Sequence, residues 1–265
     1  MKRLSAIILA VVMLFAVSAC GDTVKYNKET GLVKEGKIII GIDDQFPPMG
    51  FRDTQNNIVG FDIELAKAVA EKMGVEAEFK VIDWASKEQE LQNGNIDVIW
   101  NGYTITDKRK EKVDFTKPYL ANAQVVVVKN DAAYTKLAEL AGKTIAAQID
   151  SSAEEAIKEN KEFYDSINNN ITGYTDNVTA LDDLELGRID ALVVDKVVAE
   201  YYLKEKVGTF RILDESLATE EYGVGVIKGN TVLLDRIQKA LDELIAEGKA
   251  AEISTAWFGS DVVLK

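Results

Sequence analysis

Short apolar runs alternate with segments of helical periodicity along most of this chain. Residues 61–73 illustrate the helical spacing, because Ile63, Ala66 and Ala70 fall on one face and Gly74 can end the helix in a left-handed conformation. The same pattern predicts further helices at 87–93, 137–140, 152–159, 180–186, 195–206, 232–247 and 250–257. Apolar runs without that spacing predict strands at 37–43, 76–82, 96–100, 124–129, 144–148 and 191–194. Strands that alternate with helices are typical of α/β folds.

One nine-residue pattern occurs twice, at 91–99 (LQNGNIDVI) and at 184–192 (LELGRIDAL). In each copy a helix-like run ends at Gly, and Ile-Asp then opens a short apolar strand. Two copies of one helix-turn-strand unit predict two similar α/β lobes. Ligands of open α/β sheets bind beyond the carboxyl ends of the strands, so residues 100–102 and 194–195 would meet at one cleft. The alternative is that Gly-x-Ile-Asp recurs by chance.

The order of the elements predicts that one lobe is inserted in the other. We expect residues 37–121 together with 222–265 to form the first lobe, and residues 122–221 to form the second. Residues 20–36 are polar and glycine-punctuated, which predicts a tether. Ser152 and Glu155 have the spacing of a capping box at the start of helix 152–159.

Residues 1–19 have the features of a signal peptide. Lys2 and Arg3 precede an apolar stretch of fourteen residues, 4–17, which is short for a membrane span of about 20 residues. The stretch ends in Val-Ser-Ala-Cys, which resembles the lipobox of bacterial lipoproteins, and this resemblance implies a diacylglyceryl group on Cys20. The alternative is an ordinary secretory signal cut near Ala19.

Composition narrows the possible functions. Loss of residues 1–19 lowers the formal net charge from −13 to −15, which disfavours nucleic acid as a partner. The chain has no His, so His-based triads, bases and metal ligands are excluded, and its one Cys leaves no disulfide. We expect no cofactor and no metal.

Three groups of polar or aromatic residues lie where predicted strands end. Residues 104–109 (TITDKR) combine a helix N-terminus, two hydroxyls and Arg109, a set that suits a carboxylate, although Thr106 could simply cap a helix and leave Arg109 in solvent. Asp195 ends an apolar strand and would attract a cation there, or would cap the following helix. Phe46 and Trp84 could flank a ligand, or pack in the core.

The chain resembles family 3 of the bacterial extracellular solute-binding proteins, which includes the lysine/arginine/ornithine-, histidine- and glutamine-binding receptors of ABC importers. The resemblance covers about residues 37–258 and is most specific at 60–65 (GFDIEL), 94–97 (GNID), 104–109 (TITDKR) and 186–191 (LGRIDA). It implies a type II periplasmic-binding-protein fold, in which two crossover strands join two α/β lobes around a ligand cleft.

The resemblance also implies a role for individual residues. Arg109 would hold the α-carboxylate of an amino acid, helped by Thr104, Ser152 and the backbone near Gly102. Asp195 would hold the α-ammonium group. The residues implied toward the side chain of the ligand are Asp43, Phe46, Trp84 and Gln148.

Some positions depart from the family pattern. Asn101 and Gly102 stand where relatives often carry small hydroxyl residues, although we still expect both to line the site, and Asp150 stands where Gly is common. Asp44, beside Asp43, has no assigned role.

We therefore expect a lipid-anchored monomer at the outer face of the membrane that captures a free polar amino acid and delivers it to an ABC permease. A basic or amide side chain is favoured, because Asp43 would repel an acid and would lose its partner beside an apolar group. The main alternative is an enzyme on the same fold, such as a cyclohexadienyl-dehydratase-like lyase. A sensor module detached from transport is a third possibility, which a neighbouring permease gene would argue against.

Overall fold

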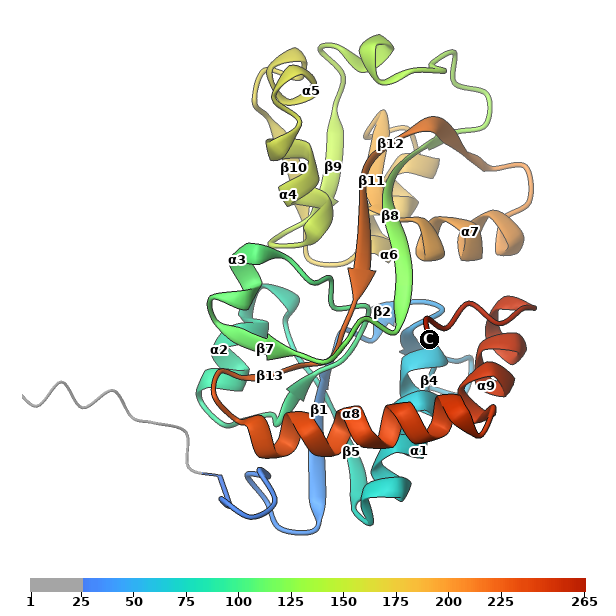
Figure 1. Ribbon diagram of the computed structural model, residues 1–265. Helices are drawn as coiled ribbons and strands as arrows, with labels where there is room; N and C mark the ends of the chain where they lie inside the picture. Colours follow the sequence, from blue (N-terminus) through green and yellow to red (C-terminus); the bar gives the residue numbers. More distant parts are fainter. Residues whose placement is uncertain (1–25) are drawn as a thin grey trace, which may run out of the picture.

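The computed structural model describes residues 26–265 and has two α/β lobes stacked one above the other (Figure 1). Each lobe is built on a five-stranded sheet, in the orders β5-β1-β6-β13-β7 and β10-β9-β11-β8-β12. The predicted two-lobed α/β fold is confirmed. Within residues 26–265, no helix combines the length and apolar character needed to cross a membrane.

The strands of the first lobe are β1 (Lys37–Ile42), β5 (Glu76–Val81), β6 (Val98–Ile99), β7 (Val113–Phe115) and β13 (Gly225–Ile227). A small antiparallel sheet adds β2 (Gln45–Phe46), β3 (Gly50–Arg52) and β4 (Ile58–Val59). The helices are α1 (Phe61–Met73), α2 (Lys87–Gln92), α3 (Asp107–Lys110), α8 (Thr231–Ala246) and α9 (Lys249–Phe258), with a 3-10 turn η1 (Trp84–Ser86).

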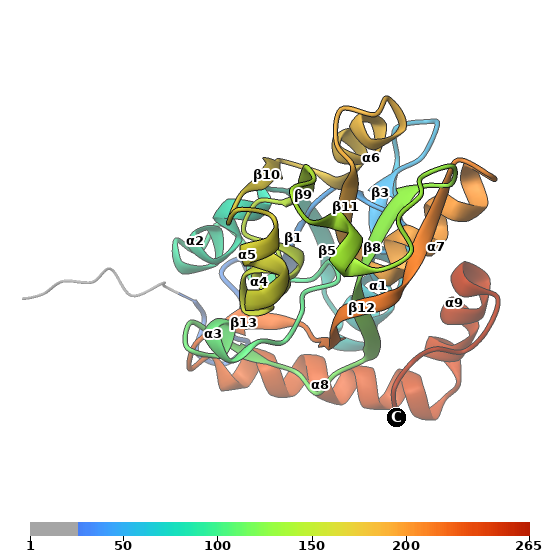
Figure 2. The ribbon, with the colours of Figure 1, turned by 90° about the horizontal axis from the view of Figure 1, so that it is seen from above.

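The strands of the second lobe are β8 (Leu120–Lys129), β9 (Ile145–Gln148), β10 (Ile171–Tyr174), β11 (Ala191–Asp195) and β12 (Phe210–Tyr222). The helices are α4 (Ser152–Glu159), α5 (Lys161–Ser166), α6 (Asn177–Glu185) and α7 (Lys196–Glu205), with a 3-10 turn η2 (Leu137–Leu140). Figure 2, the view from above, shows α4 and α5 on one side of this sheet and α6 and α7 on the other. Such a two-sided cover explains the continuous apolar runs of β9 and β11.

The repeated pattern occupies the same place in both lobes. Strands β6 and β11 are each the central strand of their sheet, with a parallel neighbour on one side and an antiparallel one on the other. The Asp of each copy holds the start of a neighbouring strand, because Asp97 accepts a hydrogen bond from Ile39 N at 2.7 Å and Asp190 accepts one from Thr144 N at 2.9 Å. The two copies are therefore structurally equivalent, and the alternative that Gly-x-Ile-Asp recurs by chance is wrong.

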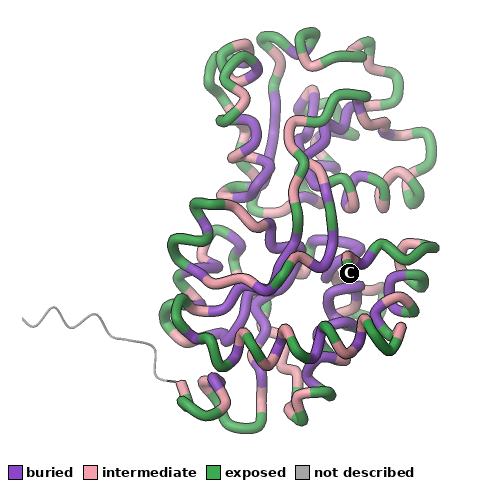
Figure 3. The backbone as a smooth tube through the Cα atoms, viewed as in Figure 1, coloured by how far each residue is buried: buried purple, intermediate pink, exposed green. Residues whose placement is uncertain are grey.

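The lobes are joined by β8 and β12, which pair antiparallel along most of their length (Figure 1). At their lower end Tyr222 also bridges Thr104 of the first lobe. The two crossover strands that the family resemblance implies are present, but β8 begins at Leu120, earlier than predicted, and the residue pattern did not predict a strand over 210–222. Figure 3 shows that the inner strands of both sheets are largely buried, whereas the edge strands β5, β10 and β12 and the outer helices include many intermediate and exposed positions.

Two further predictions were wrong in detail. Helix α4 is capped by Ser151, whose Oγ accepts a hydrogen bond from Glu154 N, so Ser152 and Glu155 do not form a capping box. Part of the expected tether packs on the first lobe, since Leu32 is fully buried and Val33 N donates to Asp97. Cys20 and the signal-like segment lie outside the described residues.

Candidate functional site

Side chains from the two lobes meet along the line where the sheets face each other. Thr104 Oγ1 lies 3.0 Å from Ser152 Oγ, and Gln148 Nε2 donates to Asp43 Oδ2 at 2.7 Å. All four residues are buried. Because each pair takes one residue from each lobe, the lobes lie closed on one another.

The first end of the site is built around Arg109. Thr106 caps helix α3 by accepting a hydrogen bond from Arg109 N at 3.2 Å, so this part of the predicted local structure is confirmed. The guanidinium group nevertheless does not extend into solvent, since Arg109 is only 4% exposed, stacks 4.7 Å from the Tyr103 ring centroid and donates to Thr104 O at 2.9 Å. A buried guanidinium that keeps further N–H donors unused can bind a carboxylate.

Asp195 forms the second end of the site. It occupies the N-cap position of α7, but its side chain makes no capping hydrogen bond, so the alternative that it serves as a helix cap is wrong. Its carboxylate instead accepts hydrogen bonds from Asn122 Nδ2 at 2.8 Å and from the Tyr222 hydroxyl. Asp195 has no cationic side-chain partner among the described residues, which leaves its negative charge available for a cationic ligand group.

Gly102 connects the two strand ends. It has a φ of +58°, and a Cβ atom there would come within 2.7 Å of the Phe46 ring and 3.2 Å of the Tyr222 ring. Tyr222 in turn donates to Asp195. The end of β6 and the end of β11 thus meet through one aromatic ring, as the position of the repeat predicts.

Asp43 and Gln148 form a third part of the site, referred to below as its side-chain end. Burial is the main cause that raises the pKa of Asp43 to about 6, so this carboxyl group is mostly ionised at neutral pH. Gln148 is held in place by Asn177 Nδ2, which donates to its Oε1 at 3.2 Å, and by Thr175 O, which accepts from its Nε2. A ligand that reaches this end of the site meets one negative charge and one amide.

Trp84 and Asn101 differ from the other predicted residues in what their side chains contact. Trp84 is buried, but it packs edge-on against Tyr103 and under the Lys87 ammonium group, as the core-packing alternative expects. Asn101 is 1% exposed and neither polar atom of its side chain has a hydrogen-bond partner among the described residues. Its amide lies against Gly50 instead of joining the other polar groups.

Two acids without a predicted role now have partners. Asp44 pairs with Arg52 inside the first lobe. Asp150, whose φ of +56° lies in the left-handed region, reaches across to the first lobe, where Lys87 Nζ donates to its Oδ2 at 3.0 Å and to its backbone oxygen at 2.9 Å. Lys87 is 1% exposed.

Polar residues on the joining strands were missed from the sequence. On β8, Asn122 and Gln124 donate hydrogen bonds to Asp195 and Ser152, and on β12 Tyr222 donates to Asp195. Glu220, also on β12, accepts hydrogen bonds from Asn122 and Gln124. The signal that could have found them is their spacing, because polar residues at i and i+2 in a strand share one face.

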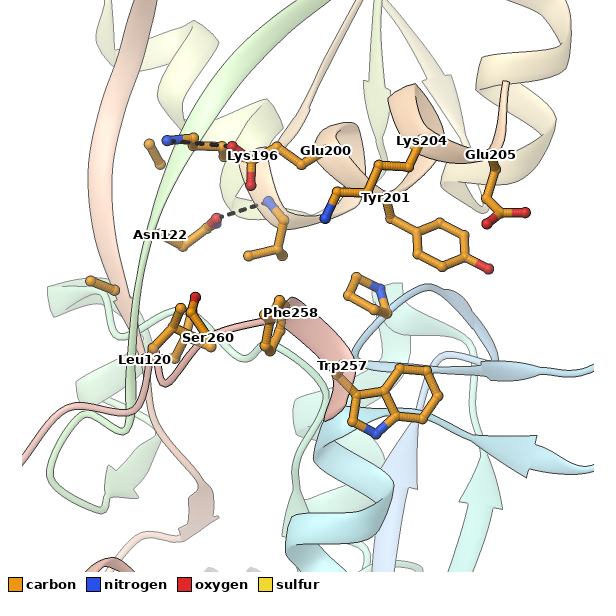
Figure 4. Close-up of a pocket in the computed structure, with 15 residues that line it drawn as sticks. Leu120, Asn122, Lys196, Glu200, Tyr201, Lys204, Glu205, Trp257, Phe258 and Ser260 are labelled. Carbon is orange, nitrogen blue, oxygen red and sulfur yellow. Dashed lines mark hydrogen bonds and ion pairs between the residues drawn. The ribbon is translucent and has the colours of Figure 1, made fainter. Parts of the chain in front are cut away.

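A hollow of about 530 Å³ opens between the lobes and is lined by Thr104, Ser152 and Glu220, among others. A second hollow of about 510 Å³ lies between α7 and α9, where Figure 4 shows Tyr201 facing Trp257 and Phe258. None of the ten predicted ligand residues lines this second hollow. The predicted ligand residues therefore lie where the facing surfaces of the two lobes are in contact.

Fold and site together define a two-lobed binding protein of the type II periplasmic class. Residues 38–260 match the bacterial extracellular solute-binding proteins, family 3, and the chain belongs to this family.

Relatives with known roles are similar over nearly the whole chain. The L-cystine-binding protein TcyJ of Escherichia coli (strain K12) is 34% identical, over 91% of this chain and 91% of its own length. The arginine-binding extracellular protein ArtP of Bacillus subtilis (strain 168) is 31% identical, over 97% of this chain and 98% of its own.

A solved structure, an ABC uptake transporter substrate-binding protein from Streptococcus pneumoniae with bound histidine, is 41% identical. It has a TM-score of 0.84 and covers 87% of this chain and 95% of its own.

Proposed function

We propose that this protein binds one free L-amino acid between its lobes and delivers it to an ABC permease. The observation that carries the proposal is the distribution of charge: at one end the buried Arg109 guanidinium is held by Thr104 O, and at the other end lies the buried Asp195 carboxylate. The Thr104 and Ser152 hydroxyls meet each other across the lobes next to the first end. An amino acid carries the complementary pair of charges on one carbon atom. Relatives named for cystine, arginine, histidine and glutamate support the same class of ligand.

In this proposal Arg109, Thr104 and Ser152 bind the α-carboxylate, and Asp195 binds the α-ammonium group. Ser152 is not needed as the helix cap, because Ser151 caps the helix, and its Oγ faces Thr104 and Gln124 instead. Gly102 and Phe46 lie beside Tyr222, which donates to Asp195, and Trp84 and Asn101 complete the proposed set.

The side-chain end of the site selects the side chain of the ligand. Asp43 is ionised at neutral pH and favours a cationic group or an amide N–H over a carboxylate. Arginine, lysine, ornithine and glutamine meet this demand. Glutamate, aspartate and leucine do not.

The anchoring and the oligomeric state are also part of the proposal. We expect Cys20 to carry a lipid that holds the protein at the outer face of the membrane, where a monomer would meet its permease. A diacyl group anchors stably, whereas a single chain binds only marginally.

A thermal-shift screen against the twenty amino acids, ornithine, citrulline and cystine tests the proposed class of ligand. Saturation at a hundredfold excess over Kd stabilises the native state by about 2.7 kcal/mol, which raises Tm by roughly 5–10 °C in a chain of this size. Calorimetry then follows the best ligand with Arg109→Ala and Asp195→Ala, each expected to weaken binding by about 2–5 kcal/mol.

Unchanged affinity in both variants would remove the two charge contacts from the proposal. Turnover of prephenate or arogenate by the purified protein would support the lyase alternative instead.

A further inference from the structure

The two strands that join the lobes carry a row of polar side chains on the face toward the site. Asn122 of β8 lies directly opposite Glu220 of β12 in the ladder, and Gln124 and Tyr222 follow at the next positions on the same face. These four residues connect the two charged ends of the site. The row lies on the only two strands that cross between the lobes in the described part of the chain.

Glu220 and Asp195 are held together by this row. Glu220 Oε1 accepts hydrogen bonds from Asn122 Nδ2 at 2.6 Å and from Gln124 Nε2 at 2.9 Å. The same Asn122 amide donates to Asp195 Oδ1 at 2.8 Å. Two carboxyl groups thus share one amide donor inside a closed cleft.

These two acids lack a cationic partner. Among residues 26–265, no Lys or Arg forms an ion pair with either carboxyl group, and the nearest hydroxyl, that of Tyr222, is neutral. The charged residues that line the hollow beside Glu220 are Asp107, Lys108, Glu155, Lys158 and Glu159. Both lysines are already paired, Lys108 with Glu155 at 2.8 Å and Lys158 with Glu154 at 2.6 Å.

Asp195 is buried and Glu220 is half-buried beside the hollow. Two neighbouring carboxylates in such a site, with no counter-ion, repel each other, and the pair lowers its free energy by keeping one proton. Burial and the charge of Asp195 hold the pKa of Glu220 well above its usual range, which makes Glu220 the member that keeps the proton. A second observation points to a missing donor at this place: Gln124 is fully buried, and its Oε1 has no hydrogen-bond partner among the described residues.

We propose that Glu220 and Asp195 form a proton-sharing acid pair, and that the α-ammonium group of the ligand displaces the proton of Glu220 as it binds. This inference rests on the proposed function. The protonated Glu220 carboxyl becomes a carboxylate, the ligand keeps its three ammonium protons, and one proton passes to the buffer. The site then holds two carboxylates around one ammonium group, so binding tightens as pH rises.

Titration calorimetry in two buffers of different ionisation enthalpy, phosphate and Tris, measures the protons released on binding. The measurement is made at about pH 7.5, because Asp43, with its pKa raised to about 6, is then already ionised. We expect the natural protein to release most of one proton, and Glu220→Gln, which keeps the shape but cannot release it, to release none. Between about pH 7 and 8 the affinity of the natural protein should rise several-fold, and that of Glu220→Gln should stay flat.

Glu221→Gln is the matched control, because Glu221 is the exposed neighbour on the same strand. Glu221→Gln should release as many protons on ligand binding as the natural protein does. Equal release by the natural protein and Glu220→Gln, or none by either, overturns the proposal.

Carbon-detected NMR of the ligand-free protein separates this proposal from the proposed function. The Glu220 carboxyl resonance is assigned by its loss in Glu220→Gln. Its chemical shift should show that the carboxyl group is still protonated at about pH 7. Titration near the ordinary Glu value would refute the acid pair even if the protein binds amino acids. A raised value in a protein that binds none of the screened ligands would support the acid pair and refute the proposed function.

Discussion

The ion pair between Lys87 and Asp150 provides a direct test of lobe closure. Lys87 follows the η1 turn in the first lobe, and Asp150 precedes helix α4 in the second, so the pair exists only while the lobes are together. Asp150→Asn removes the charge and keeps the shape. Asn also tolerates the left-handed backbone conformation that Asp150 adopts, so the local fold should survive.

The size of the effect follows from the unequal burial of the two partners. Loss of one partner from a fully buried pair costs about 3–5 kcal/mol, whereas an exposed pair contributes about 0–1 kcal/mol. The Lys87 side chain is 1% exposed and the Asp150 side chain 45% exposed, which places this pair between the two cases. We expect a loss of about 1–2 kcal/mol, or roughly 5- to 30-fold in Kd.

The assay measures Kd by calorimetry and the dissociation rate by stopped flow, with the best ligand from the screen. Because the pair forms only in the closed state, the loss should appear mainly in the dissociation rate. The control is Glu155→Gln, which breaks the exposed cross-lobe pair with Lys108, whose side chain is 64% exposed, and should change Kd by less than about threefold.

The ammonium group of Lys87 also lies 3.6 Å from the Glu88 carboxylate, so Lys87 keeps one ionic partner in Asp150→Asn, which is a further reason to expect less than the full cost of a buried unpaired charge. An unchanged dissociation rate in Asp150→Asn, with normal folding, would refute the reasoning.

Other predictions concern the remaining carboxyl groups and the N-terminus. Burial raises the pKa of Asp62 to about 7, against about 3.9 in an unfolded chain, so its protonation stabilises the native state below about pH 4 and this contribution is lost as pH rises to about 7. Asp62→Asn should therefore lose less stability than the natural protein between about pH 5 and 8 in denaturant titrations, and equal pH slopes would contradict this. Asp43→Asn should weaken the binding of a cationic side chain more than that of glutamine in competition calorimetry; an equal loss for both would place Asp43 outside the selecting contacts. Cys20→Ser should move the protein from the membrane to the soluble fraction in a native-like host, and continued membrane association would rule out the lipid anchor.

The sequence predicted the parts of the fold that depend on local pattern. Helix α1 has the predicted bounds, because its apolar face and Gly74 are both visible in the sequence. The equivalence of β6 and β11 follows from the repeated Gly-x-Ile-Asp, since Asp97 and Asp190 each hold the start of a neighbouring strand. Such signals are local, and they need no knowledge of the partner strand.

The features that were missed depend on contacts far apart in the sequence. The strand from Phe210 to Tyr222 is rich in exposed charged residues, because it joins two lobes and has no apolar face of its own along much of its length. Glu220 becomes a site residue only because Asn122, nearly a hundred positions earlier, lies opposite it. The choice of Ser152 over Ser151 as the cap failed for a smaller reason: adjacent serines offer two cap positions, and the backbone conformation of Ser151 decides between them.

Each end of the proposed site takes contacts from both lobes. Thr104 meets Ser152 at the carboxylate end, and Asp43 meets Gln148 at the side-chain end. At the ammonium end, Asp195 of the second lobe meets Tyr222, which the joining strand brings beside Gly102 of the first. An open molecule would therefore offer a ligand only half of each set of contacts. In the proposed function, ligand affinity and lobe closure are therefore thermodynamically coupled. A substitution that weakens the contacts of either lobe with the ligand should also shift the equilibrium between the open and closed forms.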